Sequence, residues 1–141
     1  MVHIRPAERR DVPAVLALWA RARSAAAVTP DTTEAVERLI ATLPGSLLVA
    51  EHGPQATVVG ALVAAWDGWR GNMYRLAVHP AHRRRGIATA LVRAGEQHLR
   101  AQGAARVTAL VAHDEGDAVG LWEAAGYARD TVITRFVRSL G

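Results

Sequence analysis

Apolar residues recur every three to four positions in four stretches of the chain, the spacing expected of helices that bury one face. Asp11 and Pro13 provide a favourable start for the first helix, and residues 31–34 resemble a capping box that opens the second. Gly86 begins the third, and Gly126 ends the fourth. The predicted helices span residues 11–23, 31–43, 86–102 and 115–125.

Shorter apolar runs, bounded by turn-forming residues, predict strands. The run at 57–66 follows the turn at 52–55 and forms a predicted hairpin with the run at 47–50. The predicted strands lie at residues 2–4, 47–50, 57–66, 73–78, 107–112 and 131–137.

The predicted elements mix strands and helices: a strand, two helices, three strands, then helix, strand, helix and strand. Consecutive strands joined by short turns pair antiparallel, whereas a strand–helix–strand unit adds a parallel neighbour. The order therefore predicts an α/β (α+β) fold. We expect a single domain over residues 1–141, with a mixed, mostly antiparallel sheet flanked by helices.

Charge and composition narrow the function classes. All 17 basic residues are arginines, and with 13 acidic residues the net charge is +4. This balance is too mild to indicate nucleic-acid binding by itself. No apolar run approaches the roughly 20 residues that span a bilayer, and residues 1–6 lack the pattern of a secretory signal. We expect a cytoplasmic protein that binds neither membranes nor nucleic acids.

The segment from residue 76 to residue 92 carries the clearest chemistry. An apolar strand ends at Val78, an arginine run follows, and a helix begins after Gly86. The first turn of a helix has unpaired backbone N–H groups and a partial positive charge, so it attracts anions. Small residues at Gly86 and Ala88 allow close approach, and arginine matches the geometry of phosphate. The segment therefore predicts a phosphate-binding loop.

Residues 83–88, with the sequence Arg-Arg-Arg-Gly-Ile-Ala, are similar to the R/Q-x-x-G-x-G/A motif of the GNAT superfamily of acyl-CoA-dependent N-acetyltransferases. Residues 115–127 resemble the second motif of that superfamily, N-x-x-A-x-x-L-Y-E-x-x-G-F. The opening of the chain, from Ile4 to Asp11, resembles the usual GNAT start. The turn at residues 66–71 is similar to that of small bacterial members of the YpeA type.

The resemblance implies a GNAT fold, whose sheet splays open between the strands at 76–78 and 107–112. It implies acetyl-CoA as co-substrate, without a metal, and an amine acceptor whose identity is open. The pyrophosphate would lie on the amides from Arg84 to Thr89, and the pantetheine arm along residues 76–78, where a backbone N–H would polarise the thioester. The implied cofactor-binding residues are Leu76, Ala77, Val78, Arg83, Arg84, Arg85, Gly86, Ile87, Ala88, Thr89 and Trp122.

The catalytic groups are less clear, because the predicted central strands contain no carboxylate. An amine with a pKa of about 10.4 is almost wholly protonated at pH 7, so a base must remove a proton. His113, with Asp114 beside it, and Asp67 are the candidates, with Glu51 a further carboxylate. Trp122 stands where relatives often have a tyrosine proposed to protonate the leaving thiolate, a role that an indole cannot take.

The leading hypothesis is direct transfer of an acetyl group from acetyl-CoA to a primary amine in a ternary complex. The chain has no cysteine to carry an acyl group covalently. The alternative is a non-catalytic acyl-CoA sensor or interaction module. A third, nucleic-acid binding through residues 82–85, is disfavoured because a phosphate-binding loop already explains those arginines. Relatives are often dimers, so a homodimer is one expected form.

Overall fold

The protein is a single α+β domain built on one five-stranded sheet, and its computed structural model describes residues 2–22, 30–111 and 116–141. The strands are β1 (Val2–Pro6), β2 (Leu47–His52), β3 (Thr57–Trp66), β4 (Gly71–Val78) and β5 (Val107–Ala109). The helices are α1 (Val12–Ala22), α2 (Thr33–Thr42), α3 (Ile87–Gln102) and α4 (Gly116–Ala124), with 3-10 turns at Arg9–Asp11 and Pro80–His82.

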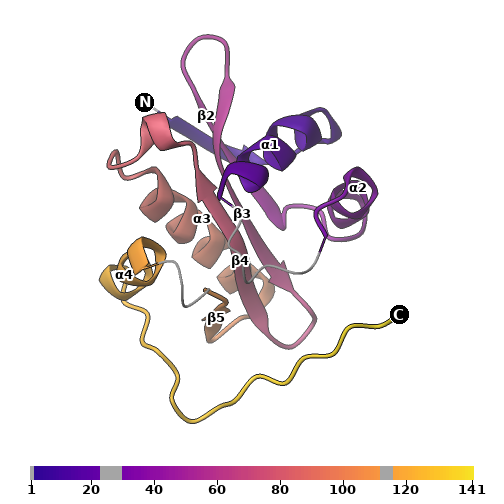
Figure 1. The fold of residues 1–141 in the computed structure, drawn as a ribbon, viewed down its shortest axis with the longest axis vertical. Coiled ribbons are helices and arrows are strands. Elements are labelled where there is room, and N and C mark those ends of the chain that lie inside the picture. The colour runs from indigo at the N-terminus through magenta and orange to yellow at the C-terminus, as the bar shows by residue number, and fades with distance from the viewer. Residues whose placement is uncertain (1, 23–29, 112–115) are drawn as a thin grey trace.

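The strands lie in the order β1-β2-β3-β4-β5. The first four pair antiparallel, and β5 pairs parallel with β4. Figure 1 shows these strands crossing the centre of the domain with helices on both sides. The mixed, mostly antiparallel sheet predicted from the sequence is therefore confirmed.

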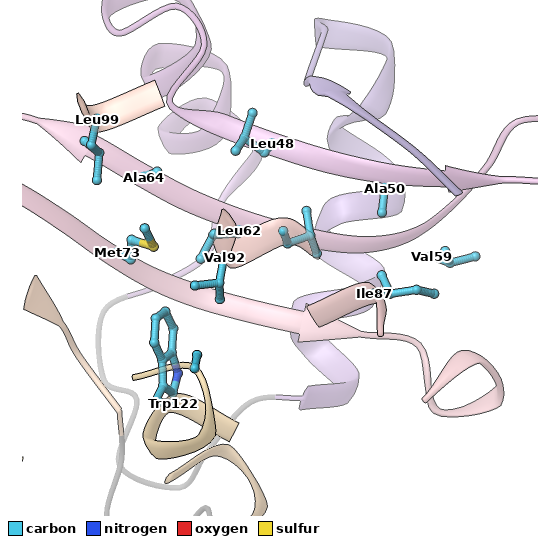
Figure 2. Packing of buried hydrophobic residues seen from close by; sticks show 12 residues of the cluster. Leu48, Ala50, Val59, Leu62, Ala64, Met73, Ile87, Val92, Leu99 and Trp122 are labelled. Atoms are coloured by element: carbon cyan, nitrogen blue, oxygen red, sulfur yellow. The ribbon is translucent and has the colours of Figure 1, made fainter. Parts of the chain in front are cut away.

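Two apolar clusters, one on each side of the sheet, form the core. On one side α3 packs Leu91, Val92 and Leu99 against the sheet. On the other side α1 packs Val15 and Trp19. Residues 59–64 of β3 are all buried, and their side chains are divided between the two clusters. Burial on both faces of the strand explains why this run is apolar throughout. Figure 2 shows the α3-side cluster, with Trp122 reaching from α4 toward the sheet.

Close packing of α3 depends on a glycine in its middle. A Cβ at Gly95 would lie 3.0 Å from Cε of Met73 and 3.1 Å from Cδ2 of Leu62. A hydrogen at this position lets the helix backbone approach the sheet closely. This contact helps to set the distance between α3 and the sheet, and with it the position of the loop that precedes the helix.

The residues that cap the starts of α1 and α2 differ slightly from those predicted. Thr32, rather than Asp31, caps α2, because its Oγ1 accepts a hydrogen bond from the Ala35 N–H at 3.1 Å. Asp11 ends the 3-10 turn before α1 and is buried, with its carboxylate paired to Arg5. Both residues thus stabilise helix starts, as their residue types favour.

The predicted strand at 131–137 is wrong. Residues 128–141 form neither helix nor strand, and their large apolar side chains are exposed, including Phe136 at 92% and Leu140 at 90%. A β-branched run forms a strand only where another strand provides hydrogen bonds and side-chain contacts, and this segment has none among the described residues. Figure 1 shows it leaving α4 and running outside the domain.

The predicted strand at 107–112 is shorter than expected, since β5 ends at Ala109 and residue 112 lies outside the described residues. Within the described ranges, no helix has the length and apolar character needed to cross a membrane. Over the same ranges, His, Asp and Glu residues do not gather in a group of three or more suited to a metal ion.

Candidate cofactor site and active site

The loop between β4 and α3 has the backbone of an anion-binding turn. Arg84 and Gly86 both adopt left-handed conformations, with φ of 63° and 77°. Gly86 is the N-cap of α3 and has no side chain to cap the N–H groups of the first turn. A Cβ there would meet nothing within 4 Å, so the positive φ, and not crowding, favours glycine. The first-turn N–H groups therefore remain available to a ligand.

The arginines of this loop add positive charge. Arg83, Arg84 and Arg85 are all exposed, and no described acidic residue forms an ion pair with any of them. Their exposed guanidinium groups lie beside the partial positive charge at the start of α3, and that of Arg85 also contacts Nδ1 of His82 at 3.4 Å. The structure brings together the loop residues that the sequence singled out.

A group of three histidines lies beside the arginines. The ring of His82 lies 5.0 Å from that of His52 and 5.9 Å from that of His79. Desolvation first, then Arg85 and the other two histidines, lower the pKa of His82, which favours the neutral form of this ring. His52 was not expected here, because it comes from the hairpin end of β2, far away along the chain.

The sheet opens next to this loop. Strands β4 and β5 pair only over Gly71–Val107, Asn72–Thr108 and Met73–Ala109, and the Leu110 N–H still bonds to the Met73 carbonyl at 3.1 Å. Beyond Met73, the rest of β4 has no pairing with β5. This is the splay predicted between the two strands.

A β-bulge marks the point of divergence. Val63 pairs with Tyr74 and Ala61 with Ala77, so Arg75 and Leu76 lie opposite the single residue between them on β3. Arg75 has a φ of 57°, an unfavourable conformation for a residue with a side chain. No residue type at this point signals the bulge, since Arg75 is neither glycine nor asparagine.

The end of β4 has apolar residues on both faces. Leu76 and Val78 pack against the α3-side cluster, whereas Ala77 is 5% exposed and belongs to the α1-side cluster. Residues 76–78 are thus an apolar strand end that leads directly into the basic loop. One continuous segment, residues 76–89, joins an open strand edge to the arginine loop and the uncapped start of α3.

The sequence model of the acetyltransferase (GNAT) family matches residues 13–127. This span runs from α1 through the bulge, the basic loop and α4 to Tyr127. The chain belongs to the GNAT acetyltransferase family.

Curated relatives agree with this assignment. An acetyltransferase of Pectobacterium atrosepticum is 34% identical over 135 residues, which cover 94% of this chain and 92% of the relative. An acetyltransferase of Yersinia pestis is 36% identical over 99 residues, covering 70% of this chain and 69% of the relative. The protein is therefore an acyltransferase of the GNAT type.

Solved structures share the fold. Ard1 from Thermoplasma volcanium superposes with a TM-score of 0.79 at 22% identity, over 90% of this chain and 82% of that one. A chain of the NatC complex bound to Gag peptide and CoA gives 0.77 at 19% identity, over 92% and 86%. At these identities the likeness concerns the GNAT fold alone.

Trp122, the α4 residue of the second GNAT motif, is 5% exposed and lies in the α3-side cluster. Its ring meets that of Tyr127 edge to face, with centroids 4.9 Å apart. The Tyr127 hydroxyl donates to Glu96 at 2.7 Å, and burial followed by this acidic partner raises the pKa of Tyr127. Tyr127 thus packs in the core and is unsuited to donate a proton at neutral pH.

The structure describes only one of the two predicted bases, Asp67. The Asp67 carboxylate is exposed at a turn, and its Oδ1 accepts the Trp69 N–H at 2.8 Å and the Arg70 N–H at 2.6 Å. These bonds, that of Arg70 first, lower the pKa of Asp67 and so weaken it as a base. His113 lies outside the described residues. Glu51, the further carboxylate, is paired with Arg5 at 2.9 Å.

Proposed function

We propose that this GNAT protein is an N-acetyltransferase that moves an acetyl group from acetyl-CoA to a primary amine by direct attack in a ternary complex. The observation that carries the proposal is the continuity of residues 76–89, in which an open strand edge leads into an exposed arginine loop and an uncapped helix start. Acetyl-CoA has phosphates at one end and a thioester at the other, so it matches both ends of this segment.

The loop holds the phosphates in this proposal. Backbone N–H groups from Arg84 to Thr89, with Ile87 and Ala88 in the first turn of α3, donate to the pyrophosphate. Arg83, Arg84 and Arg85 neutralise its charge, with arginine forks on phosphate oxygens. The role of Gly86 is to keep the left-handed turn that exposes these donors.

The strand edge holds the other end of the co-substrate. Leu76, Ala77 and Val78 bind the pantetheine arm through their apolar surface and through backbone groups left unpaired by β5. A backbone N–H of this stretch donates to the thioester carbonyl, which favours the charge that develops on that oxygen by about 3 kcal/mol. Trp122 lines the inner end of the site, toward the sulfur.

Proton removal from the acceptor is assigned to His113 or Asp67. About one amine in 2,500 is neutral at pH 7 if its pKa is about 10.4, so the base has a large effect on rate. Asp67 is the weaker base, because its carboxylate already accepts two backbone N–H groups. The leaving group requires no strong acid. With a thiol pKa of about 8.5, release of the thiolate costs only about 2 kcal/mol more than release of the thiol at pH 7.

An amine panel tests the proposed reaction. Purified protein with acetyl-CoA and primary amines, including an N-terminal peptide, a lysine peptide, a polyamine and an aminoglycoside, is expected to release free thiol with at least one acceptor. His113→Ala is expected to lower kcat/KM about 100-fold and to remove the acidic limb of the pH–rate profile, whereas Asp67→Asn changes it less. Absence of thiol release above the rate of hydrolysis across the panel would refute acetyl transfer to amines of these classes.

The proposal includes a homodimer. Residues 128–141 form a C-terminal tail, of which five large apolar residues are 71–92% exposed: Val132, Ile133, Phe136, Val137 and Leu140. Leu110, directly after β5, is also exposed, at 47%. The tail has the composition of a strand and β5 is an edge strand, so the proposed dimer pairs the tail of one copy with β5 of the other.

A further inference from the structure

The bulge in β4 is held from outside the sheet by α1. The indole Nε1–H of Trp19 donates a hydrogen bond to the Arg75 carbonyl, at 2.9 Å. Trp19 is 5% exposed and lies in the α1-side cluster. Its partner is the carbonyl of the one described residue of β4 with a positive φ, so the bond acts on the bulge itself.

A second contact holds the same residue by its side chain. The Arg75 guanidinium pairs with the Asp31 carboxylate at 2.8 Å, just before α2. The side chains are 22% and 13% exposed, so the pair is partly shielded from water. A left-handed residue with a side chain costs about 1 kcal/mol or more, and two such contacts are of the size needed to offset that cost.

The orientation of one peptide group follows from the Trp19 bond. The peptide bonds of the described chain are not cis, and in a trans peptide the N–H points opposite to the carbonyl of the same plane. Because the Arg75 carbonyl points to Trp19 on α1, the Leu76 N–H points away from α1. Leu76 is also the first of residues 76–78, the stretch to which the proposed function assigns the thioester.

We infer that Trp19 is a positioning residue for acetyl transfer. Its indole N–H fixes the plane of the 75–76 peptide and so aims the Leu76 N–H at the thioester carbonyl oxygen. The inference rests on the proposed function and adds a residue of α1 to it. Trp19 itself does not touch the reacting atoms. Its contribution is to keep the donor preorganised, because a donor that must reorient during the reaction stabilises the developing charge less.

Trp19→Phe is the direct test, since phenylalanine keeps an aromatic ring in the core and removes the N–H. We expect kcat to fall about tenfold while KM for acetyl-CoA changes less than about twofold, because the lost interaction acts mainly in the transition state. The carbonyl stretch of bound ¹³C-labelled acetyl-CoA is expected at higher frequency than in the wild-type complex, since the oxygen is less polarised.

Val15→Ala is the matched control. Val15 lies one turn earlier on α1, is fully buried in the same cluster, and has no polar side-chain group with which to hold the bulge. It is expected to lower Tm as Trp19→Phe does but to leave kcat within about twofold of wild type and the carbonyl stretch in place.

Two outcomes are distinct. Equal kcat and equal carbonyl frequency in Trp19→Phe and Val15→Ala would overturn the positioning role while leaving the proposed function intact. A wild-type protein that fails to bind acetyl-CoA would overturn the proposed function, and this inference with it.

Discussion

At the scale of single residues, Asp11 shows how charge is used inside the domain. Its carboxylate is 6% exposed and accepts two guanidinium N–H bonds from Arg5, at 2.8 and 2.9 Å. It also accepts the Glu8 N–H at 2.7 Å, which caps the turn before α1. The Arg5 bonds, the largest cause, lower the pKa of Asp11, and burial opposes them. The ion pair thus joins β1 to the start of α1.

Replacing Asp11 by asparagine is expected to lower the free energy of unfolding at pH 7 by about 2 kcal/mol, because Arg5 loses a partly buried partner. The pKa of Asp11 is lower in the folded than in the unfolded chain, so its stabilisation is complete above about pH 4 and is lost as the pH falls through the folded pKa. Urea denaturation of both proteins between pH 7 and pH 2 measures the difference. A difference that does not shrink on acidification would contradict this account.

Single residues also show what the sequence reveals of the site. The basic loop was predictable because Arg83, Gly86 and the start of α3 are neighbours in sequence, and their chemistry is local. Arg75 was not, because a left-handed φ at an arginine depends on the register between β3 and β4 and on the contact with Trp19. Asp67 was predicted by residue type, whereas its turn hydrogen bonds follow from backbone geometry.

At the scale of elements, the packing of α3 on the sheet positions the basic loop that precedes this helix. Gly95 is the point of close approach, under Met73 and Leu62. Gly120, on α4, is exposed, and a Cβ added there would meet no atom within 4 Å. The two helical glycines therefore differ in environment and provide a matched pair.

Gly95→Val is expected to destabilise the fold by about 2 kcal/mol, because the added methyl groups displace Met73 and Leu62 and lift α3. Gly120→Ala is expected to stabilise it by about 0.5–1 kcal/mol, since alanine has the higher helix propensity and open space. Chemical denaturation measures both. Equal effects of the same sign would show that contact with the sheet does not determine the role of Gly95.

Elements with a strong apolar pattern bounded by turn residues were predictable, whereas composition alone was misleading at the end of the chain. The prediction of residues 57–66 coincides with β3, and that of 86–102 differs from α3 by one residue. The run at 131–137 has strand composition but no strand beside it among the described residues, and composition alone does not supply a partner.

At the scale of the whole molecule, the tail carries most of the exposed large apolar side chains in the described part of the chain. Six of the eight exposed large apolar residues in the described part of the chain are Leu110 and the five of the tail. Burying half of the tail side chains would contribute on the order of 5 kcal/mol per tail. We therefore expect the intact chain to pair with a second copy.

Sedimentation equilibrium tests this expectation. The full chain is expected at twice the mass of one chain, and a chain ending at Ala128 at the mass of one. Phe136→Asp is expected to weaken the dimer at least tenfold, whereas Arg138→Gln, on the same tail, leaves it within about twofold. A full-length chain that stays monomeric at high micromolar concentration would contradict the homodimer.

The central claim concerns residues 76–89 as the acetyl-CoA site, and titration calorimetry with acetyl-CoA tests it most directly. Gly86→Glu places a carboxylate among the N–H groups that we propose bind the phosphates, and Gly126→Glu makes the same change at another left-handed, open glycine. We expect micromolar binding by the wild type, a loss of about 100-fold or more in Gly86→Glu, and little change in Gly126→Glu. Equal affinity in all three proteins would contradict the assignment.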